Sequence, residues 1–143
     1  MFDRIFLYVE DRRASAPAID LALSLAGLLG SRLFATCIIN TSDLPEGPSR
    51  QAKLADAEEE AWQALYEIED DAFGREISIS LLLDQGNPLE RLLDLARSYQ
   101  AKLIVAAARN RLALPELLRQ SPVPVILAPE QLGQTSETDE RAV

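Results

Sequence analysis

The stretch DQGNPLERLLDLARSYQAKLIVAAARNR, residues 84–111 of this 143-residue chain, joins a helix pattern to a strand pattern. Its first half predicts a helix, because Asn87 can cap, Pro88 suits the first helical position, and Glu90 follows three residues after the cap. Its second half contains the short apolar run 102–108, which is typical of a strand covered on both faces of a parallel sheet. A capped helix leading into such a strand indicates an α/β fold.

The same alternation of strands and helices continues through residues 1–129. We expect further strands at 4–9, 32–39, 76–83 and 123–128, and helices between Ser15 as N-cap and Gly30 as C-cap, at 50–73, and at 114–120. Five strands alternating with helices predict a three-layer α/β sandwich around a mostly parallel sheet. The polar tail 130–143 is expected to be disordered and to lie outside this single domain.

Composition narrows the classes of function. The net charge of -9 disfavours binding to nucleic acid or to anionic membranes, because both require a basic surface. No apolar run approaches the about 20 residues that span a bilayer, and the N-terminus lacks a secretory pattern, so we expect a cytoplasmic protein.

The residue types that usually build catalytic and metal sites are scarce. The chain has no histidine, and its one cysteine, Cys37, lies in an apolar run where a small buried hydrophobe is expected. The acidic residues of 56–60 alternate with an apolar helical stripe, which indicates a solvated face. We therefore predict no metal site and no enzymatic activity.

Three segments together resemble the universal stress protein family: RIFLYVEDRRASAPAIDLALSLAGLLGSRLFATCII at 4–39, the stretch 84–111, and SPVPVILAP at 121–129. The likeness covers residues 1–129. It implies a Rossmann-like fold of the adenine nucleotide alpha hydrolase type, with a five-stranded parallel sheet in the order 3-2-1-4-5. It also implies a homodimer, often formed through the last strand.

Many members of that family bind ATP through an aspartate ending the first strand, an aliphatic residue ending the second, and a glycine motif after the fourth. By resemblance, these positions fall on Glu10 and Ile38, while the two glycines become Ala107 and Asn110. The closing Gly-Ser has no counterpart. A phosphate needs backbone N–H groups at close approach, which glycine permits and alanine hinders. We predict a non-catalytic protein that has lost ordinary ATP binding and works as a homodimer with an unidentified protein partner.

A second hypothesis is a small-molecule sensor. Four arginines follow the first and fourth strands, which the resemblance makes neighbours: Arg12, Arg13, Arg109 and Arg111. Arginine grips phosphate through a planar fork and needs no glycine loop, so ATP, AMP or another anion would bind there. The alternative is structural, with Arg12 and Arg13 paired to Glu10 and Asp11 and the other two solvated.

A third hypothesis is a phosphorylatable receiver-like domain, with Glu10, Asp11 and Asp84 holding Mg²⁺. It requires the third strand to lie beside the first. The order implied by the universal stress protein resemblance puts the second strand between them, so the strand order distinguishes the two hypotheses. Receiver domains also resemble one another in a lysine after the last strand, where this chain has LAPE at 127–130.

The last predicted strand is an edge strand, and an apolar edge invites pairing with a second copy. Its candidate dimer residues are Val123, Val125 and Leu127. Nearby prolines limit how much of this edge can donate hydrogen bonds.

Overall fold

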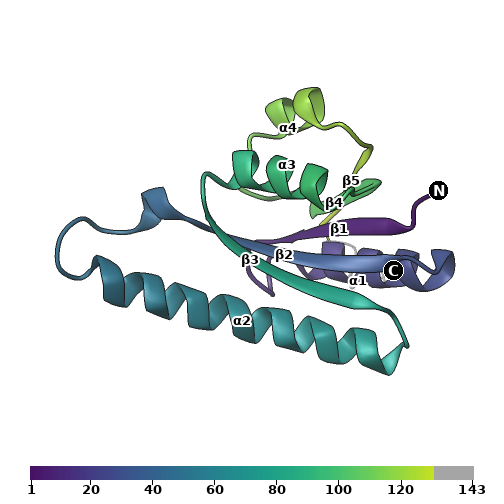
Figure 1. Cartoon of the computed structure of the whole chain (residues 1–143), viewed down its shortest axis with the longest axis horizontal. Coiled ribbons are helices and arrows are strands. Elements are labelled where there is room, and N and C mark those ends of the chain that lie inside the picture. Colours follow the sequence, from purple (N-terminus) through teal and green to yellow (C-terminus); the bar gives the residue numbers. More distant parts are fainter. Residues whose placement is uncertain (131–143) are drawn as a thin grey trace, which may run out of the picture.

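A computed structural model describes residues 1–130, which form a five-stranded parallel sheet between two layers of helices (Figure 1). The strand order is β3-β2-β1-β4-β5, as predicted. The strands are β1 (Arg4–Val9), β2 (Arg32–Asn40), β3 (Ile79–Gly86), β4 (Leu103–Ala107) and β5 (Val125–Ala128). The helices are α1 (Ala16–Leu29), α2 (Arg50–Gly74), α3 (Pro88–Ser98) and α4 (Leu114–Gln120), with a 3-10 turn, η1, at Thr41–Asp43. Apart from Glu130, the tail predicted to be disordered lies outside the described residues.

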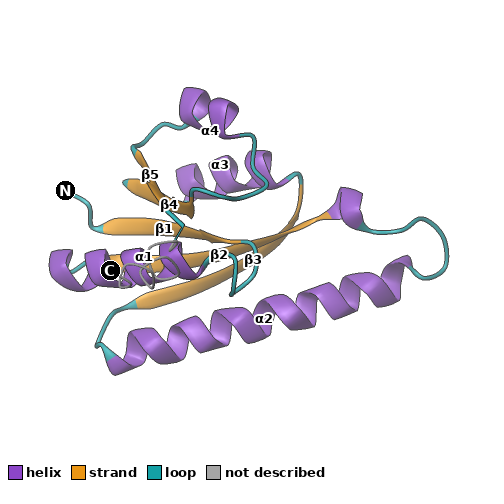
Figure 2. Cartoon of the chain, turned by 180° about the vertical axis from the view of Figure 1, so that it is seen from behind, coloured by secondary structure: helices purple, strands orange, loops and turns teal. Residues whose placement is uncertain are grey.

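Two core clusters hold the three layers together. Side chains alternate along β1, so Ile5, Leu7 and Val9 pack with α1 and α2, while Phe6 and Tyr8 pack with α3 and α4. All five residues are buried, which explains the continuous apolar run. Figures 1 and 2 show α1 and α2 on one side of the sheet and α3 and α4 on the other.

Two of the predicted helix ends are confirmed. The side-chain oxygen of Asn87 accepts the N–H of Glu90 at 3.0 Å, which caps α3. Gly30 closes α1 with φ of 66°, a left-handed conformation that glycine adopts without steric cost.

Ser15 takes the N-cap position of α1, as predicted, but its side chain makes no capping hydrogen bond. Its buried hydroxyl accepts the N–H of Glu10 at 2.9 Å, so it fixes the end of β1 instead. The turn before α1 is held by Asp11, whose carboxylate accepts the N–H of Ala14 at 2.7 Å. A serine that follows a strand end this closely has two backbone donors within reach, and the sequence does not decide between them.

β3 starts and ends later than the predicted 76–83. Glu76 takes a left-handed φ of 58°, and the N–H of Ile77 still bonds to Ala72, so these residues finish α2. The strand then continues to Gly86 because its pairing with β2 extends that far. Backbone pairing, rather than apolar content, sets this end of the strand.

β5 is shorter than predicted and begins at Val125, because Pro122 and Pro124 have no N–H to donate. Val123 therefore lies before the strand. Its side chain, like those of Val125 and Leu127, packs half-buried on the α3 and α4 side of the core. The edge that a second copy would meet is thus mainly backbone. β4 is one residue shorter than predicted at each end.

The strand order rules out the receiver-like hypothesis. β2 separates β3 from β1, so Asp84 lies across a strand from Glu10. The Asp84 carboxylate binds Arg91 at 2.7 Å instead. Within residues 1–130, no group of acidic, cysteine or histidine side chains could hold a metal ion. Over the same residues, no helix is both long and apolar enough to cross a membrane.

Candidate functional site

A crevice opens beyond the carboxyl ends of β1 and β2, where ligands of open parallel sheets bind. Its cavity has a volume of about 870 Å³. One wall is α2, and the other is formed by the start of α3 and the turn between β4 and α4. Leu44 and Pro45, after β2, complete the lining, so the loop 41–50 borders the crevice.

Glu10 links the end of β1 to the β4–α4 turn. Its carboxylate accepts the backbone N–H of Arg111 at 2.5 Å and the hydroxyl of Tyr8 at 3.4 Å. Tyr8 and Glu10 are two residues apart along an extended chain, so their side chains share a face. Burial, followed by the Glu10 charge, raises the pKa of Tyr8, so its hydroxyl stays protonated and donates.

The side chain of Asn110 holds the β4–α4 turn by hydrogen bonds to the backbone of the turn. Its side-chain amide donates to the carbonyl of Ala107, and its oxygen accepts the N–H of Leu112 at 2.7 Å. The non-glycine residues at positive φ among 1–130 lie elsewhere in the chain, so this turn is built from conformations that ordinary residues adopt. Side-chain hydrogen bonds therefore hold the turn without glycine.

Arginines bridge the crevice walls. The guanidinium of Arg111 binds Asp43 of η1 at 3.0 Å, and this hydrogen bond raises the pKa of Arg111. Arg12 binds Glu67 of α2 and lies 3.5 Å from Asp71. The predicted pairing of Arg12 with the neighbouring acids Glu10 and Asp11 is replaced by these longer-range ion pairs.

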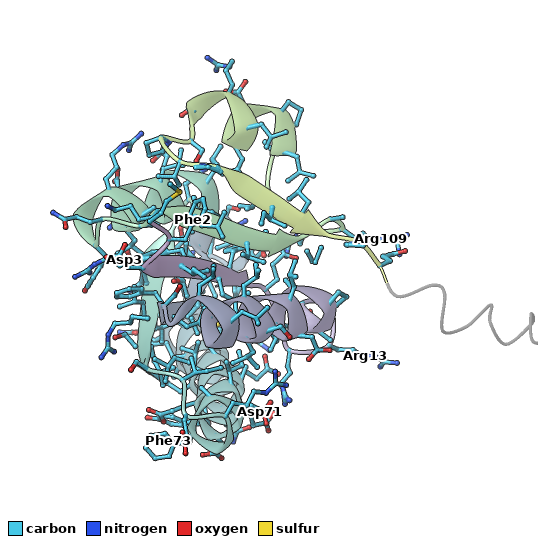
Figure 3. The ribbon with its side chains drawn as sticks, turned by 90° about the vertical axis from the view of Figure 1, so that its right-hand side faces the viewer. Phe2, Asp3, Arg13, Asp71, Phe73 and Arg109 are labelled. Atoms are coloured by element: carbon cyan, nitrogen blue, oxygen red, sulfur yellow. The ribbon has the colours of Figure 1, made fainter. Side chains whose placement is uncertain are left out.

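The structure brings together four of the predicted site residues as crevice lining: Glu10, Arg12, Ile38 and Arg111. Arg13 and Arg109 project outward from the same side of the molecule in Figure 3, and Arg109 binds Glu130. Ala107 is buried in the core beneath α1, and Asn110 is engaged within the turn. The four arginines therefore do not form one ring.

Carboxylates outnumber cations around the crevice, five to three. The acidic residues are Glu10, Asp11, Asp43, Glu60 and Glu67, and the basic residues are Arg12, Lys53 and Arg111. An anionic ligand would therefore meet an excess of negative charge.

Tyr8 and Asp43 contact the predicted site residues of the crevice but were not among the candidate site residues themselves. Tyr8 could have been found, because a residue two positions before Glu10 shares its face of the sheet. Asp43 lies directly after the second strand, where ligands of such sheets bind, but its contact with Arg111 depends on η1, where Asn40 accepts the N–H of Ser42 at 3.1 Å.

A parallel sheet in this order, with a crevice where the order reverses, defines a Rossmann-like α/β domain. The model of the universal stress protein family matches residues 1–129, and the chain belongs to this family. A search of curated proteins finds no match to the sequence.

Several solved structures share the fold. A universal stress family protein from Burkholderia pseudomallei is 23% identical, with a TM-score of 0.77 over 90% of this chain and 97% of its own. A family protein from Arabidopsis thaliana with AMP bound is 8% identical, with a TM-score of 0.72 over 92% and 94%. The Archaeoglobus fulgidus universal stress protein in complex with dAMP is 20% identical, with a TM-score of 0.64 over 89% and 98%.

Proposed function

We propose that this chain is a non-catalytic universal stress-type protein that does not bind ATP and acts in a stress response through homodimerisation and contact with protein partners. The observation that carries the proposal is the self-closed β4–α4 turn. The N–H groups of Arg111 and Leu112 already donate to Glu10 and Asn110, at 2.5 and 2.7 Å. A phosphate at this turn would have to displace those acceptors.

Charge supports the same conclusion. Glu10 places a carboxylate against the turn where a phosphate would otherwise accept hydrogen bonds. Bringing a polyphosphate there would set like charges against each other in a crevice that is already acidic. The arginines of the lining offer little compensation, because Arg12 and Arg111 are engaged by carboxylates of α2 and η1.

The chemistry of the crevice side chains favours a binding role over catalysis. The chain has no histidine to act as a base near neutral pH. Burial raises the pKa of Cys37 to about 12, so this thiol stays protonated and is a poor nucleophile. Tyr8 is held protonated in the same way.

The homodimer would form along the outer edge of β5, which pairs only with β4 among the described residues. Sedimentation should then show a dimer at tens of micromolar protein. A monomer at that concentration would contradict this part of the proposal.

Calorimetric titration with ATP and with AMP, both with Mg²⁺, tests the nucleotide part. We expect no heat of binding at high micromolar ligand. Glu10→Ala is the companion variant, because it removes the carboxylate that occupies the Arg111 amide.

A second candidate is a nucleotide or anion sensor. The cavity of about 870 Å³ is large enough for a small ligand, and relatives of the same fold have been solved with AMP and with dAMP bound. Clear binding of AMP that disappears when Arg109→Ala is combined with Arg111→Ala would favour this function over the first.

A further inference from the structure

The outer flank of α2, away from the crevice, carries an aromatic stripe made of Trp62, Tyr66 and Phe73. Steps of four and seven residues place these side chains on one line along the helix. Trp62 stacks on Tyr66 with ring centroids 5.6 Å apart, and Tyr66 and Phe73 are 53% and 78% exposed. Figure 3 shows Phe73 and Asp71 pointing to different sides of α2. The crevice does not use this stripe.

The stripe runs along an open sheet edge. Figures 1 and 2 show α2 lying lengthwise beside β3, and β3 pairs only with β2 among residues 1–130. Trp62 packs onto the same core cluster as Leu81 and Leu83 of β3. Alternate residues of β3 direct their backbone groups away from β2. At the two ends of this row the carbonyl of Ile79 accepts from Arg32 and the N–H of Gln85 donates to Asp84, which leaves the middle of the strand open beside α2. Such an edge is a template for an added strand.

Charge decides which occupant fits. Four acidic residues lie three or four positions from an aromatic residue of the stripe: Glu58, Glu59, Glu69 and Asp70. A second copy of this chain would bring the same carboxylates to the contact. The chain's own segment 131–143 is also acidic, with Glu137, Asp139 and Glu140 against Arg141. Both of these occupants are disfavoured by repulsion.

We propose that the β3 edge and the aromatic stripe bind an extended segment of another protein that mixes apolar and basic residues. The segment would add as a strand to β3, its backbone pairing with the edge. Side chains on its α2 side would cover the aromatic stripe and meet the acidic residues beside it. This inference rests on the proposed function in one respect, namely that the chain works by contact with other proteins.

The chain contains a single tryptophan, Trp62, so its fluorescence reports directly on this surface. The probe is a short synthetic peptide that repeats Lys-Thr-Val-Thr, which places lysine and valine on the same face of a strand, and it is compared with a counterpart in which glutamate replaces lysine. We expect the lysine peptide to shift Trp62 emission to the blue and the glutamate peptide to leave it unchanged. The affinity for the lysine peptide should fall as salt rises from about 0.05 to about 0.5 M, because Glu59 and Asp70 are exposed and Glu58 and Glu69 are partly exposed.

Two variants locate the contact, with calorimetry as the readout that does not depend on the rings. Tyr66→Ala with Phe73→Ala should weaken the lysine peptide at least about tenfold. Glu59→Lys with Asp70→Lys should abolish binding. The matched control, Asp20→Lys with Glu46→Lys, changes exposed acids elsewhere by the same net charge and should bind as the unmodified chain does.

Three results would overturn the inference: no binding of the lysine peptide, equal binding of both peptides, or equal losses in the control and the Glu59/Asp70 variant. A dimer that disappears in the Tyr66/Phe73 variant would instead assign the surface to a second copy. The nucleotide titration is independent of this test. ATP binding would defeat the proposed function whatever the peptides do, and failure of the lysine peptide would defeat only this surface.

Discussion

The two flanks of α2 differ in what their side chains contact. On the inner flank, Glu67 and Asp71 meet Arg12 from the β1–α1 turn and help to close the crevice. On the outer flank, Tyr66 and Phe73 leave much of their ring surface in water. Tyr66 and Glu67 are neighbours in sequence, and the rotation of about 100° per residue places them on different flanks of the helix. Charge on the inner flank thus helps to hold the domain together, whereas the outer flank leaves apolar surface exposed.

Leu65 lies on the core face between the two flanks and is fully buried, so its replacement should have the largest effect. We expect Leu65→Ala to lower the free energy of unfolding by about 2–5 kcal/mol, through lost burial and the cavity that remains. Urea denaturation followed by circular dichroism measures this. The neighbouring Tyr66→Ala should cost less than about 1 kcal/mol, since half of its surface is exposed. Equal losses of unfolding free energy in the two variants would mean that α2 packs on the sheet with a different face.

The core face of α2 could be predicted from sequence, because Leu65, Ile68 and Ala72 recur at helical spacing and are indeed buried. The two flanks could not be told apart in that way. Which flank faces the crevice depends on how α2 lies across β2 and β3, and periodicity carries no information about that angle. The spacing of Trp62, Tyr66 and Phe73 aligns them on the helix, but it does not show that this line lies beside β3.

The candidate site, too, could be predicted from the sequence only in part. Glu10 follows from the rule that ligands meet the carboxyl ends of strands, Ile38 follows from the family resemblance, and both line the crevice. The partners of the arginines do not follow from any local rule. Arg111 reaches Asp43 and Arg12 reaches Glu67 across long stretches of chain, so only the folded arrangement brings these charges together.

Two buried side chains of the crevice lining, Cys37 and Tyr8, should make the stability of the protein depend on pH in the alkaline range. Burial raises the pKa of Cys37 from 9.0 to about 12, so between these values the unfolded chain loses a proton that the folded chain keeps. The free energy of unfolding should therefore fall as pH rises through this window, by about 2 kcal/mol at a pH of about 10.5. Tyr8 acts in the same direction.

Denaturation midpoints measured across this window test the pH prediction. Cys37→Ala should flatten the dependence, and Tyr8→Phe should remove the smaller contribution at its upper end. A pH dependence that both variants leave unchanged would show that other groups are responsible.

Removing the acceptor that closes the β4–α4 turn should have an intermediate effect. Glu10→Ala leaves the buried hydroxyl of Tyr8 without its carboxylate partner and should cost about 1–2 kcal/mol of unfolding free energy. Glu10→Gln, which keeps an acceptor oxygen, should cost less. In a Tyr8→Phe background the cost of Glu10→Ala should shrink, because the donor is already absent. Unchanged stability of Glu10→Ala would show that the closed turn does not depend on this carboxylate.

The smallest effect is expected where the inner flank meets Arg12. The three side chains of this ion pair are between 43% and 59% exposed, so Arg12→Ala should cost no more than about 1 kcal/mol, and less at high salt. Glu59→Ala on the outer flank is the control and should be nearly neutral. A much larger, salt-independent loss in Arg12→Ala would mean that water is excluded from the inner flank. A loss no greater than that of Glu59→Ala would mean that the ion pairs do not stabilise the crevice, and the flanks would then differ only in their apolar surface.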